Sequence, residues 1–481
     1  MPLGLIGTLE VAKRGLDANR QGIELTGHNL SNVSNLAYAR QRLRIQTSEA
    51  LPSPTGPIGT GSKVSSIEQV RDRLLDAEIV RENSVSGYLE SRQKALEFAE
   101  VNLGQQLDDR QASSAEGATA SLGIGGQFGI IEGLSDFFNA WQALSTNPNS
   151  TADRQIVLLR GGSLTEKFNS VSTRLSNLRD DLNIRVQDEV KLANQLLADI
   201  SDISMSITSS EIDDVGKAND LRDRRQEKLE ALSKYVNMTY SEDTVTNQLN
   251  LSIGGVRIIS NDSVVDTLKG VADRSTGVER TKVQTAGGTS VKLTKGSIKG
   301  VIDARDEEIK TVSDDLDTLA RELITQVNTA HSAGIALDGV STGAVFFSGS
   351  NASDIALNTV LKNDPSRIQA SSNGEPGNNG VALKLAKMAN QTQSALGNLI
   401  FSERYNQTVA NLGQALNSTN NQMQDQDAVN RMLARQRDSI SGVSVDEEMA
   451  NLIVFQRAFQ ASARMITTLD ELLQSVINLT R

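Results

Sequence analysis

The side chains best suited to acid–base or metal chemistry are few in this chain. It has two histidines, His28 and His331, in different expected elements, and no cysteine. A histidine-dependent catalytic centre or a metal site built on histidine and cysteine therefore has little material. His28 lies beside an apolar helical stripe, where a packing or hydrogen-bonding role is the ordinary interpretation.

Neighbouring carboxylates can work as an acid–base pair. The clusters of this kind are Asp180-Asp181, Asp213-Asp214, Asp306-Glu307-Glu308 and Asp446-Glu447-Glu448. Each falls at an expected helix start or on an expected solvent-facing side, where acids favour the helix N-terminus or stay hydrated. The sequence thus predicts no catalytic residue, no metal ligand and no cofactor.

A glycine-rich run, Gly123 to Gly129, precedes an expected helix and raises the possibility of a phosphate-binding loop. No strand is expected before it, and its spacing fits neither the dinucleotide-binding fingerprint nor the P-loop. We interpret it as a connection between helices. The segments 241–300 and 332–380, where a catalytic insertion would lie, contain neither histidine nor cysteine. We therefore predict that the protein is not an enzyme.

Both ends of the chain carry the apolar spacing of a coiled-coil helix. Apolar or small residues alternate in steps of four and three, which keeps one face of a helix toward a partner. The residues that we expect to form this assembly seam are Leu5, Leu9, Leu16, Ile23 and Leu30 near the N-terminus, and Leu452, Phe455, Phe459, Ile466, Leu469, Leu473 and Val476 near the C-terminus. Neither stripe can be buried alone. The two ends must pair with each other or with the ends of neighbouring copies.

Composition and charge argue against nucleic-acid-binding, membrane-spanning and signal-peptide-secreted proteins. The formal net charge is 48 − 59 = −11, without a basic stripe, which argues against nucleic acid as the main partner. No stretch approaches the length of a membrane-spanning helix. Residues 1–20 lack the apolar core of a cleavable secretory signal. With only 3% aromatic residues, aliphatic and thin cores are expected, as in elongated helical bundles.

These patterns predict a mainly α fold: an elongated helical bundle with paired N- and C-terminal coiled-coil helices and a small β-rich insertion. Helices are expected over 3–33, 67–106, 131–144, 151–208, 301–330, 381–389 and 399–438, with a last helix after 441–443. A short extended piece is expected at Leu43 and Ile45. Alternating apolar residues around Gly254-Gly255 predict a β-hairpin, and Gly287-Gly288 has a similar setting.

We divide the chain into three parts. Residues 1–35 and 440–481 form a terminal helical assembly domain, residues 36–240 and 301–439 a helical rod-like domain, and residues 241–300 a small β-rich insertion. The segment 332–380 is rich in Ser, Asn and Gly and is interpreted as a surface lobe or loop.

Motifs at the two ends resemble the signatures of bacterial flagellar axial proteins. The N-terminal motifs are Gly15-Leu16-Asp17-Ala18-Asn19-Arg20, Asn29-Leu30-Ser31-Asn32-Val33 and Tyr38-Ala39-Arg40-Gln41. The C-terminal motifs are Val445-Asp446-Glu447-Glu448-Met449-Ala450-Asn451-Leu452 and Phe459-Gln460-Ala461-Ser462-Ala463-Arg464. One departure is that the turn Asn35-Leu36-Ala37-Tyr38 lacks the glycine that relatives usually carry there.

Internal motifs are similar to the hook-associated proteins of the hook–filament junction within this superfamily. They are Phe137-Phe138-Asn139-Ala140-Trp141, Asp220-Leu221-Arg222-Asp223-Arg224-Arg225 and Gly300-Val301-Ile302-Asp303-Ala304-Arg305-Asp306. The resemblance covers the chain except the β-rich insertion and 332–380. Another axial subunit, either a hook protein or the second junction protein, is the alternative, and the motif at 137–141 speaks against it.

The resemblance implies a structural subunit of the flagellum. Such a subunit is exported unfolded by the flagellar type III pathway, without a cleaved signal peptide, and assembles outside the cell at the distal end of the hook as an adaptor to the filament. The implied partners are further copies in a tubular assembly, hook protein, the second hook–filament junction protein and an export chaperone on the C-terminal helix. The implied terminal seams stay unpaired until neighbouring copies arrive.

Overall fold

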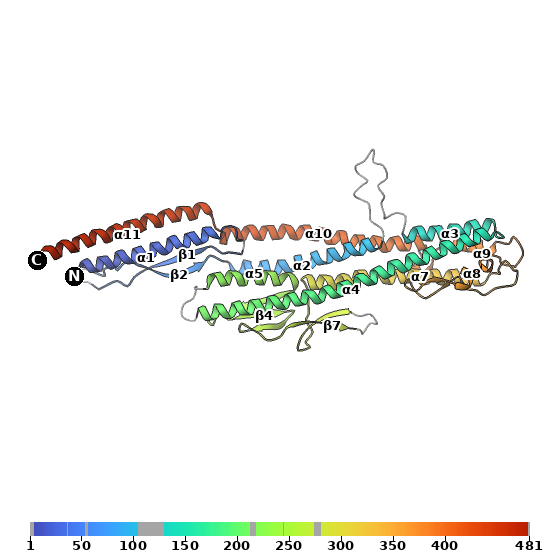
Figure 1. Ribbon diagram of the computed structural model, residues 1–481, viewed down its shortest axis with the longest axis horizontal. Coiled ribbons are helices and arrows are strands. Elements are labelled where there is room, and N and C mark those ends of the chain that lie inside the picture. Colours follow the sequence, from blue (N-terminus) through green and yellow to red (C-terminus); the bar gives the residue numbers. More distant parts are fainter. Residues whose placement is uncertain are drawn as a thin grey trace, which may run out of the picture.

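The computed structural model describes the 481-residue chain except residues 1–3, 36, 53–55, 104–128, 212–217, 244, 274–279 and 480–481. The molecule is elongated, with its helices running along the long axis and its strands lying mainly on one side (Figure 1). The N- and C-termini lie at the same end (Figure 1). This architecture confirms the mainly α, elongated class with a small β-rich insertion.

The rod is built around α4 (Thr151–Ser210), a helix of 60 residues and therefore about 90 Å long. The Ser150 hydroxyl caps it by accepting a hydrogen bond from the Asp153 backbone N–H at 3.2 Å. Along its inward face runs a stripe of apolar residues at helical spacing, and every member is buried: Val171, Leu175, Leu178, Leu182, Val186, Val190 and Ala193. Burial of a stripe at this spacing stabilises a helix that propensity alone would leave marginal.

Other helices complete the rod. They are α2 (Arg73–Asn102), α3 (Ile130–Thr146), α5 (Asn219–Tyr235), α6 (Ser297–Asp303), α7 (Ile309–Ser332) and α10 (Phe401–Ser441). Most of them pack on α4, while α10 packs on α2 and α7. A π-helical turn at Ala304–Glu308 joins α6 to α7. The expected helix over 301–330 is thus helical throughout, and the π-helical turn within it brings the buried Arg305 to Asn183 of α4.

At the far end of the rod from the termini, an aromatic cluster closes the core. The Phe137 ring of α3 lies 5.6 Å from the Phe346 ring and 5.4 Å from the Phe347 ring, measured between ring centroids. The Trp141 ring lies 5.4 Å from the Phe346 ring. The segment 332–380, expected as a surface lobe or loop, thereby places two aromatic rings in the main core. Its short elements are β9 (Phe347–Ser348), β10 (Ala356–Leu357) and α8 (Thr359–Asn363), before α9 (Gly380–Lys387).

The β-rich insertion lies against α4 (Figure 1). One sheet has four strands in the order β3 (Met238–Glu242), β4 (Leu249–Ile253), β5 (Val256–Ser260) and β6 (Ser263–Val264); a two-stranded sheet pairs β7 (Leu268–Asp273) with β8 (Arg280–Thr285). The expected hairpin turn is Gly254-Gly255, with φ of 56° and 86°. Both angles favour glycine, as in a type I′ turn.

The terminal part contains α1 (Gly4–Ser31), the antiparallel strands β1 (Gln41–Thr47) and β2 (Ser62–Gln69), and α11 (Val445–Leu479). The prediction that helix resumes near residue 67 is wrong, because 62–69 pairs with β1 and α2 begins only after its cap, Asp72. Among the described residues, no helix is long and apolar enough to cross a membrane.

Candidate assembly interface

The helices α1 and α11 lie side by side and run in opposite directions (Figure 1). Two glycines of α1 fix the register. A Cβ on Gly22 would lie 2.6 Å from the Phe455 ring, and one on Gly15 would lie 3.3 Å from the Ser462 hydroxyl. The two glycines are seven residues apart, and so are their partners Phe455 and Ser462, but the partners follow in the reverse order along the chain. This is the register of an antiparallel coiled coil.

The residues expected to form the assembly seam lie along this helix pair. All are partly buried in the single chain except Val476, which is 47% exposed: Leu5, Leu9, Leu16, Ile23, Leu30, Leu452, Phe455, Phe459, Ile466, Leu469 and Leu473. Because each helix faces one partner helix and otherwise much solvent, these side chains keep a fraction of their surface exposed. Their role in assembly stays a prediction.

The two stripes find each other within one chain. Of the alternatives left open by the sequence, pairing between the two ends is the one seen. The implied unpaired seams are therefore not a feature of the folded chain. Exposed apolar side chains remain on the rest of α11, among them Met449, Ile453, Val454 and Met465.

A polar joint connects this pair to the rod, and Asn29 of α1 lies at its centre. Asn29 is 2% exposed and uses its whole hydrogen-bonding capacity. Its Nδ2 donates to Gln41 O at 2.8 Å and to Glu448 Oε2 at 3.2 Å. Its Oδ1 accepts from the Tyr38 hydroxyl at 2.7 Å and from Gln41 N–H at 3.1 Å. One amide thus ties α1, the following turn, β1 and α11 together.

Arg40 forms the second element of the joint. Its Nε donates to Glu448 Oε1 at 2.8 Å and its Nη1 to Glu447 Oε2 at 2.6 Å. Its backbone N–H donates to Ser441 O at 2.9 Å, at the end of α10. The Glu448 side chain is 3% exposed whereas that of Glu447 is 62% exposed. The acids at 446–448 lie in the first turn of α11, as expected, but Glu448 is in addition buried and receives two donors from the N-terminal segment.

His28 and Tyr38 extend the joint toward α5. The Tyr38 hydroxyl donates to Asn29, so it accepts from His28 Nδ1 at 3.1 Å. His28 Nε2 lies 3.7 Å from Asp220 Oδ2, and Gln41 Nε2 donates to Asp220 Oδ1 at 2.9 Å. The packing and hydrogen-bonding role expected for His28 is confirmed.

Asp223 of α5 receives the last contacts of the joint. Arg71 Nη2 and Gln69 Nε2 donate to its Oδ1 at 3.0 and 2.9 Å. Burial raises the pKa of Asp223 to about 7, although Arg71 opposes the shift. Burial and the nearby Asp220 also raise the pKa of Tyr38, which keeps its hydroxyl protonated as a donor.

The remaining groups considered for chemistry have structural roles where they are described. His331 is fully buried on α7: its Nδ1 lies 2.8 Å from Ala344 O, and its Nε2 accepts from Gln369 N–H at 3.0 Å. Asp306 pairs with Arg305 and Glu308 pairs with Arg92, while Asp180-Asp181 is exposed on α4. Residues 123–128 and Asp213-Asp214 lie outside the described residues. Within the described chain, no group of acids and histidines could hold a metal ion.

Sequence reasoning did not foresee the joint, although it had quoted its members. Asn29, Tyr38, Arg40 and Gln41 belong to the N-terminal motifs, Glu447 and Glu448 to the C-terminal motif, and Asp220 and Asp223 to an internal motif. Polar residues at fixed places in three distant motifs were the available signal, because a hydrogen-bonded network needs particular donors and acceptors.

Comparison with known proteins agrees with this architecture. A family model described as the flagellar hook-associated protein FlgK helical domain matches residues 120–347. Another, described as the flagellar basal body rod FlgEFG protein C-terminal, matches residues 434–479.

Curated relatives align over nearly the whole chain. Flagellar hook-associated protein 1 of Bacillus subtilis is 27% identical, over 98% of this chain and 97% of the relative. The proteins of the same name from Salmonella typhimurium and Escherichia coli are each 21% identical over 97% of this chain and over 99% and 98% of their own length. The solved structure of the flagellar hook junction protein FlgK from Burkholderia pseudomallei has the same fold, with a TM-score of 0.61 at 12% identity, covering 76% of this chain and all of that one.

Proposed function

Because the chain belongs to the family of flagellar hook-associated protein 1, we propose that it is the structural subunit of a bacterial flagellum that joins the hook to the filament. The proposal rests on the polar joint, in which motifs from both termini meet around Asn29 and Gln41 links them to Asp220 of the internal motif. Such a joint sets the direction of the terminal helix pair relative to the rod. An adaptor between two tubular structures needs this kind of fixed orientation.

The paired terminal helices are the surface by which copies associate in the proposed tube. Their stripe is only partly buried in one chain, so further apolar area can be covered when copies stack. Hook protein and the second hook–filament junction protein are the proposed neighbours along the axis. An export chaperone on the C-terminal helix would protect the same apolar residues before assembly.

The proposed location is outside the cell, at the distal end of the hook, after export by the flagellar type III pathway without a cleaved signal peptide. We assign no catalytic role. Its two histidines lie on different helices, α1 and α7, and both are held in hydrogen bonds that a structural role explains. A hydrolase screen on the full chain tests this assignment, and any hydrolase activity would contradict it.

Deletion of residues 452–481 tests the proposal. The truncated chain should remain soluble and retain the rod, because α11 packs mainly on α1, but it should fail to join hook to filament. Cells carrying it should have hooks without filaments, and full-length protein supplied in trans should restore filaments. Normal filaments on the truncated protein would refute the proposal. Immunolabelling along the hook instead of at its distal end would favour the alternative, another axial subunit.

A further inference from the structure

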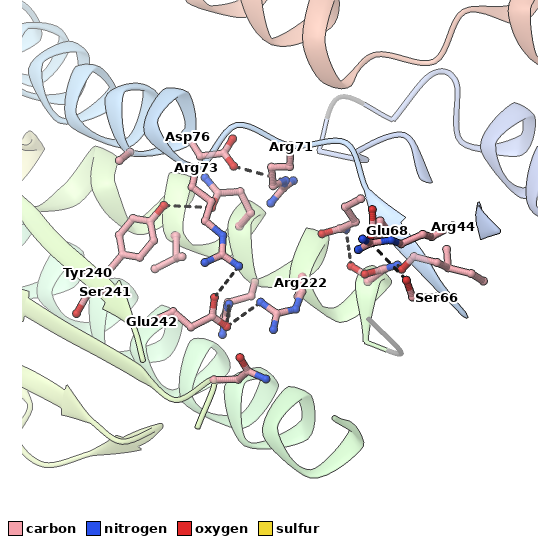
Figure 2. A pocket seen from close by; sticks show the side chains of 18 residues that line it. Arg44, Ser66, Glu68, Arg71, Arg73, Asp76, Arg222, Tyr240, Ser241 and Glu242 are labelled. Atoms are coloured by element: carbon pink, nitrogen blue, oxygen red, sulfur yellow. Dashed lines mark hydrogen bonds and ion pairs between the residues drawn. The ribbon is translucent and has the colours of Figure 1, made fainter. Parts of the chain in front are cut away.

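A cleft of about 660 Å³ opens where the β1–β2 hairpin, the start of α2, helix α5 and strand β3 meet (Figure 2). It lies beside the polar joint but is formed largely by other side chains. Its lining is unusual for an acidic chain, because arginines predominate. The arginines are Arg44, Arg71, Arg73, Arg222 and Arg225, and the acids are Glu68, Asp76 and Glu242. Five positive and three negative groups give 5 − 3 = +2 when all are charged.

The inner end of the cleft has more guanidinium groups than carboxylates to receive them. Glu242 Oε1 accepts from Arg222 Nη1 at 2.7 Å and from Arg225 Nη2 at 3.1 Å. Arg73 reaches toward the same carboxylate from the mouth of the cleft, with its Nη2 3.8 Å from Oε2 (Figure 2). Three cations therefore share one carboxylate.

Arg225 is the least satisfied of the three. It is 7% exposed, and its Nη1 has no hydrogen-bond partner within the described part of the chain. Burying a guanidinium group with an unused donor is unfavourable unless an anion compensates it. Burial accordingly lowers the pKa of Arg225, against the opposite influence of Glu242.

Two further acids, Glu211 and Asp223, lie behind the wall and bring the formal sum to 5 − 5 = 0, so the unused donors on Arg73 and Arg225 are what the cleft offers. Glu211 holds Arg222 through two hydrogen bonds, of 3.2 and 2.6 Å, and is thereby fully engaged. Asp223 holds Arg71 at 3.0 Å; burial raises the pKa of Asp223 to about 7, and Arg71 opposes this shift. Arg73, with a side chain that is 77% exposed, keeps unused donors at the mouth.

We propose that this cleft is a binding site for a small oxoanion, a phosphate or a carboxylate, held between Arg73 and the Arg222–Arg225 pair. Guanidinium groups present paired N–H donors that match two oxygens of such an anion. The Asn247 amide lines the same cleft and donates to Glu211 Oε2 at 3.3 Å, which leaves its second N–H as a neutral donor. An occupied site would bridge α2 and α5, and so brace the side of the rod next to the joint. This inference does not depend on the proposed function.

Phosphate binding to the full chain tests the site directly. ³¹P NMR line broadening of inorganic phosphate should saturate in the millimolar range or below, at an ionic strength held constant with chloride. Binding is measured instead of melting temperature because phosphate stabilises most proteins by exclusion from their surface. Arg73→Gln should weaken binding about tenfold, the loss expected for one charge-assisted contact. Arg73 is exposed, so this variant should fold, which circular dichroism checks.

The matched control is Arg81→Gln, which removes another exposed arginine of α2 that lies outside the cleft and pairs with Glu78. It should bind phosphate like the unmodified chain. The proposal would be overturned if the unmodified chain, Arg73→Gln and Arg81→Gln bound phosphate with equal affinity. It would also be overturned if phosphate did not bind saturably and Arg73→Gln did not change self-association.

A second arm identifies the source of the anion. If a carboxylate of another copy fills the cleft, Arg73→Gln should weaken self-association in sedimentation experiments, and phosphate should compete with it. If the ligand is a free anion, binding should be independent of protein concentration and self-association should not respond to Arg73→Gln. Either pattern supports an oxoanion site, and the absence of both rejects it.

Discussion

Glu447 and Glu448 offer a test of the polar joint, because the two neighbours bind the same arginine from different environments. Glu448 accepts from Arg40 Nε at 2.8 Å and from Asn29 Nδ2 at 3.2 Å, and its side chain is 3% exposed. Glu447 accepts from Arg40 Nη1 at 2.6 Å, and its side chain is 62% exposed. Glu448→Gln places an amide NH₂ among these donors, whereas Glu447→Gln changes a contact that water screens.

The expected cost of Glu448→Gln follows from these contacts. Breaking a fully buried ion pair costs about 3–5 kcal/mol. Arg40 is partly exposed and keeps Glu447, and Asn29 keeps its bond to Gln41 O, so we expect about 2–3 kcal/mol. For Glu447→Gln we expect about 0–1 kcal/mol, as for other exposed pairs.

Hydrogen exchange of the full chain, read by mass spectrometry, is the suitable assay because the joint can open without unfolding the rod. Peptides spanning the end of α1, β1 and the start of α11 should lose protection about 30- to 150-fold in Glu448→Gln, which is the factor for 2–3 kcal/mol. Glu447→Gln should change it by less than about fivefold. Trp141, at the opposite end of the rod, supplies a fluorescence control for global unfolding. Equal loss of protection in both variants would refute the assignment of Glu448 as the buried anchor.

Two further predictions concern packing and pH. Gly22→Ala should separate α1 from α11, because the new Cβ would lie 2.6 Å from the Phe455 ring, and hydrogen exchange in α11 should rise. Gly27→Ala is the control: a Cβ there would have no atom within 4 Å, so the variant should stabilise the helix by about 0.5–1 kcal/mol. Burial lowers the pKa of His331 from 6.5 to about 4. As the pH falls from 6.5 to 4, His331 therefore takes up a proton in the unfolded chain but not in the folded chain, and the free energy of unfolding should fall by about 3 kcal/mol in total. Urea unfolding followed by Trp141 fluorescence should show this loss, and His331→Gln should remove that part of the pH dependence; an unchanged dependence in the variant would contradict it.

Repetitive features of the fold were open to prediction from the sequence. The α4 stripe and the two terminal stripes recur at helical spacing over many residues, so a single misread position does not change the conclusion. The Gly254-Gly255 hairpin was equally accessible, because two positive φ angles in succession leave few alternatives to glycine. Periodicity reports which face of an element is buried, and this is enough for the fold class.

The features that were missed depend on contacts between distant segments. Residues 62–69 have no strong strand pattern of their own and become a strand by pairing with β1. Phe346 and Phe347 stand in a segment poor in periodicity, and only the tertiary fold brings them against Phe137. Likewise, the acids at 446–448 match an ordinary helix start, and nothing local reveals that Arg40 comes from the other end of the chain to meet them.

The apolar seam and the polar joint have different roles in positioning the terminal helices: the seam pairs them, and the joint fixes their orientation. Apolar contacts between α1 and α11 are non-directional, so they favour pairing but tolerate rotation and sliding of the pair relative to the rod. Hydrogen bonds to Asn29 and Glu448 are directional and satisfy buried groups completely, so any other orientation would leave donors unpaired. The proposed tubular assembly needs both properties, because copies must be attracted by apolar area and held at one angle. This explains why the motifs that carry the family resemblance are polar at the joint, although the seam carries most of the apolar contact.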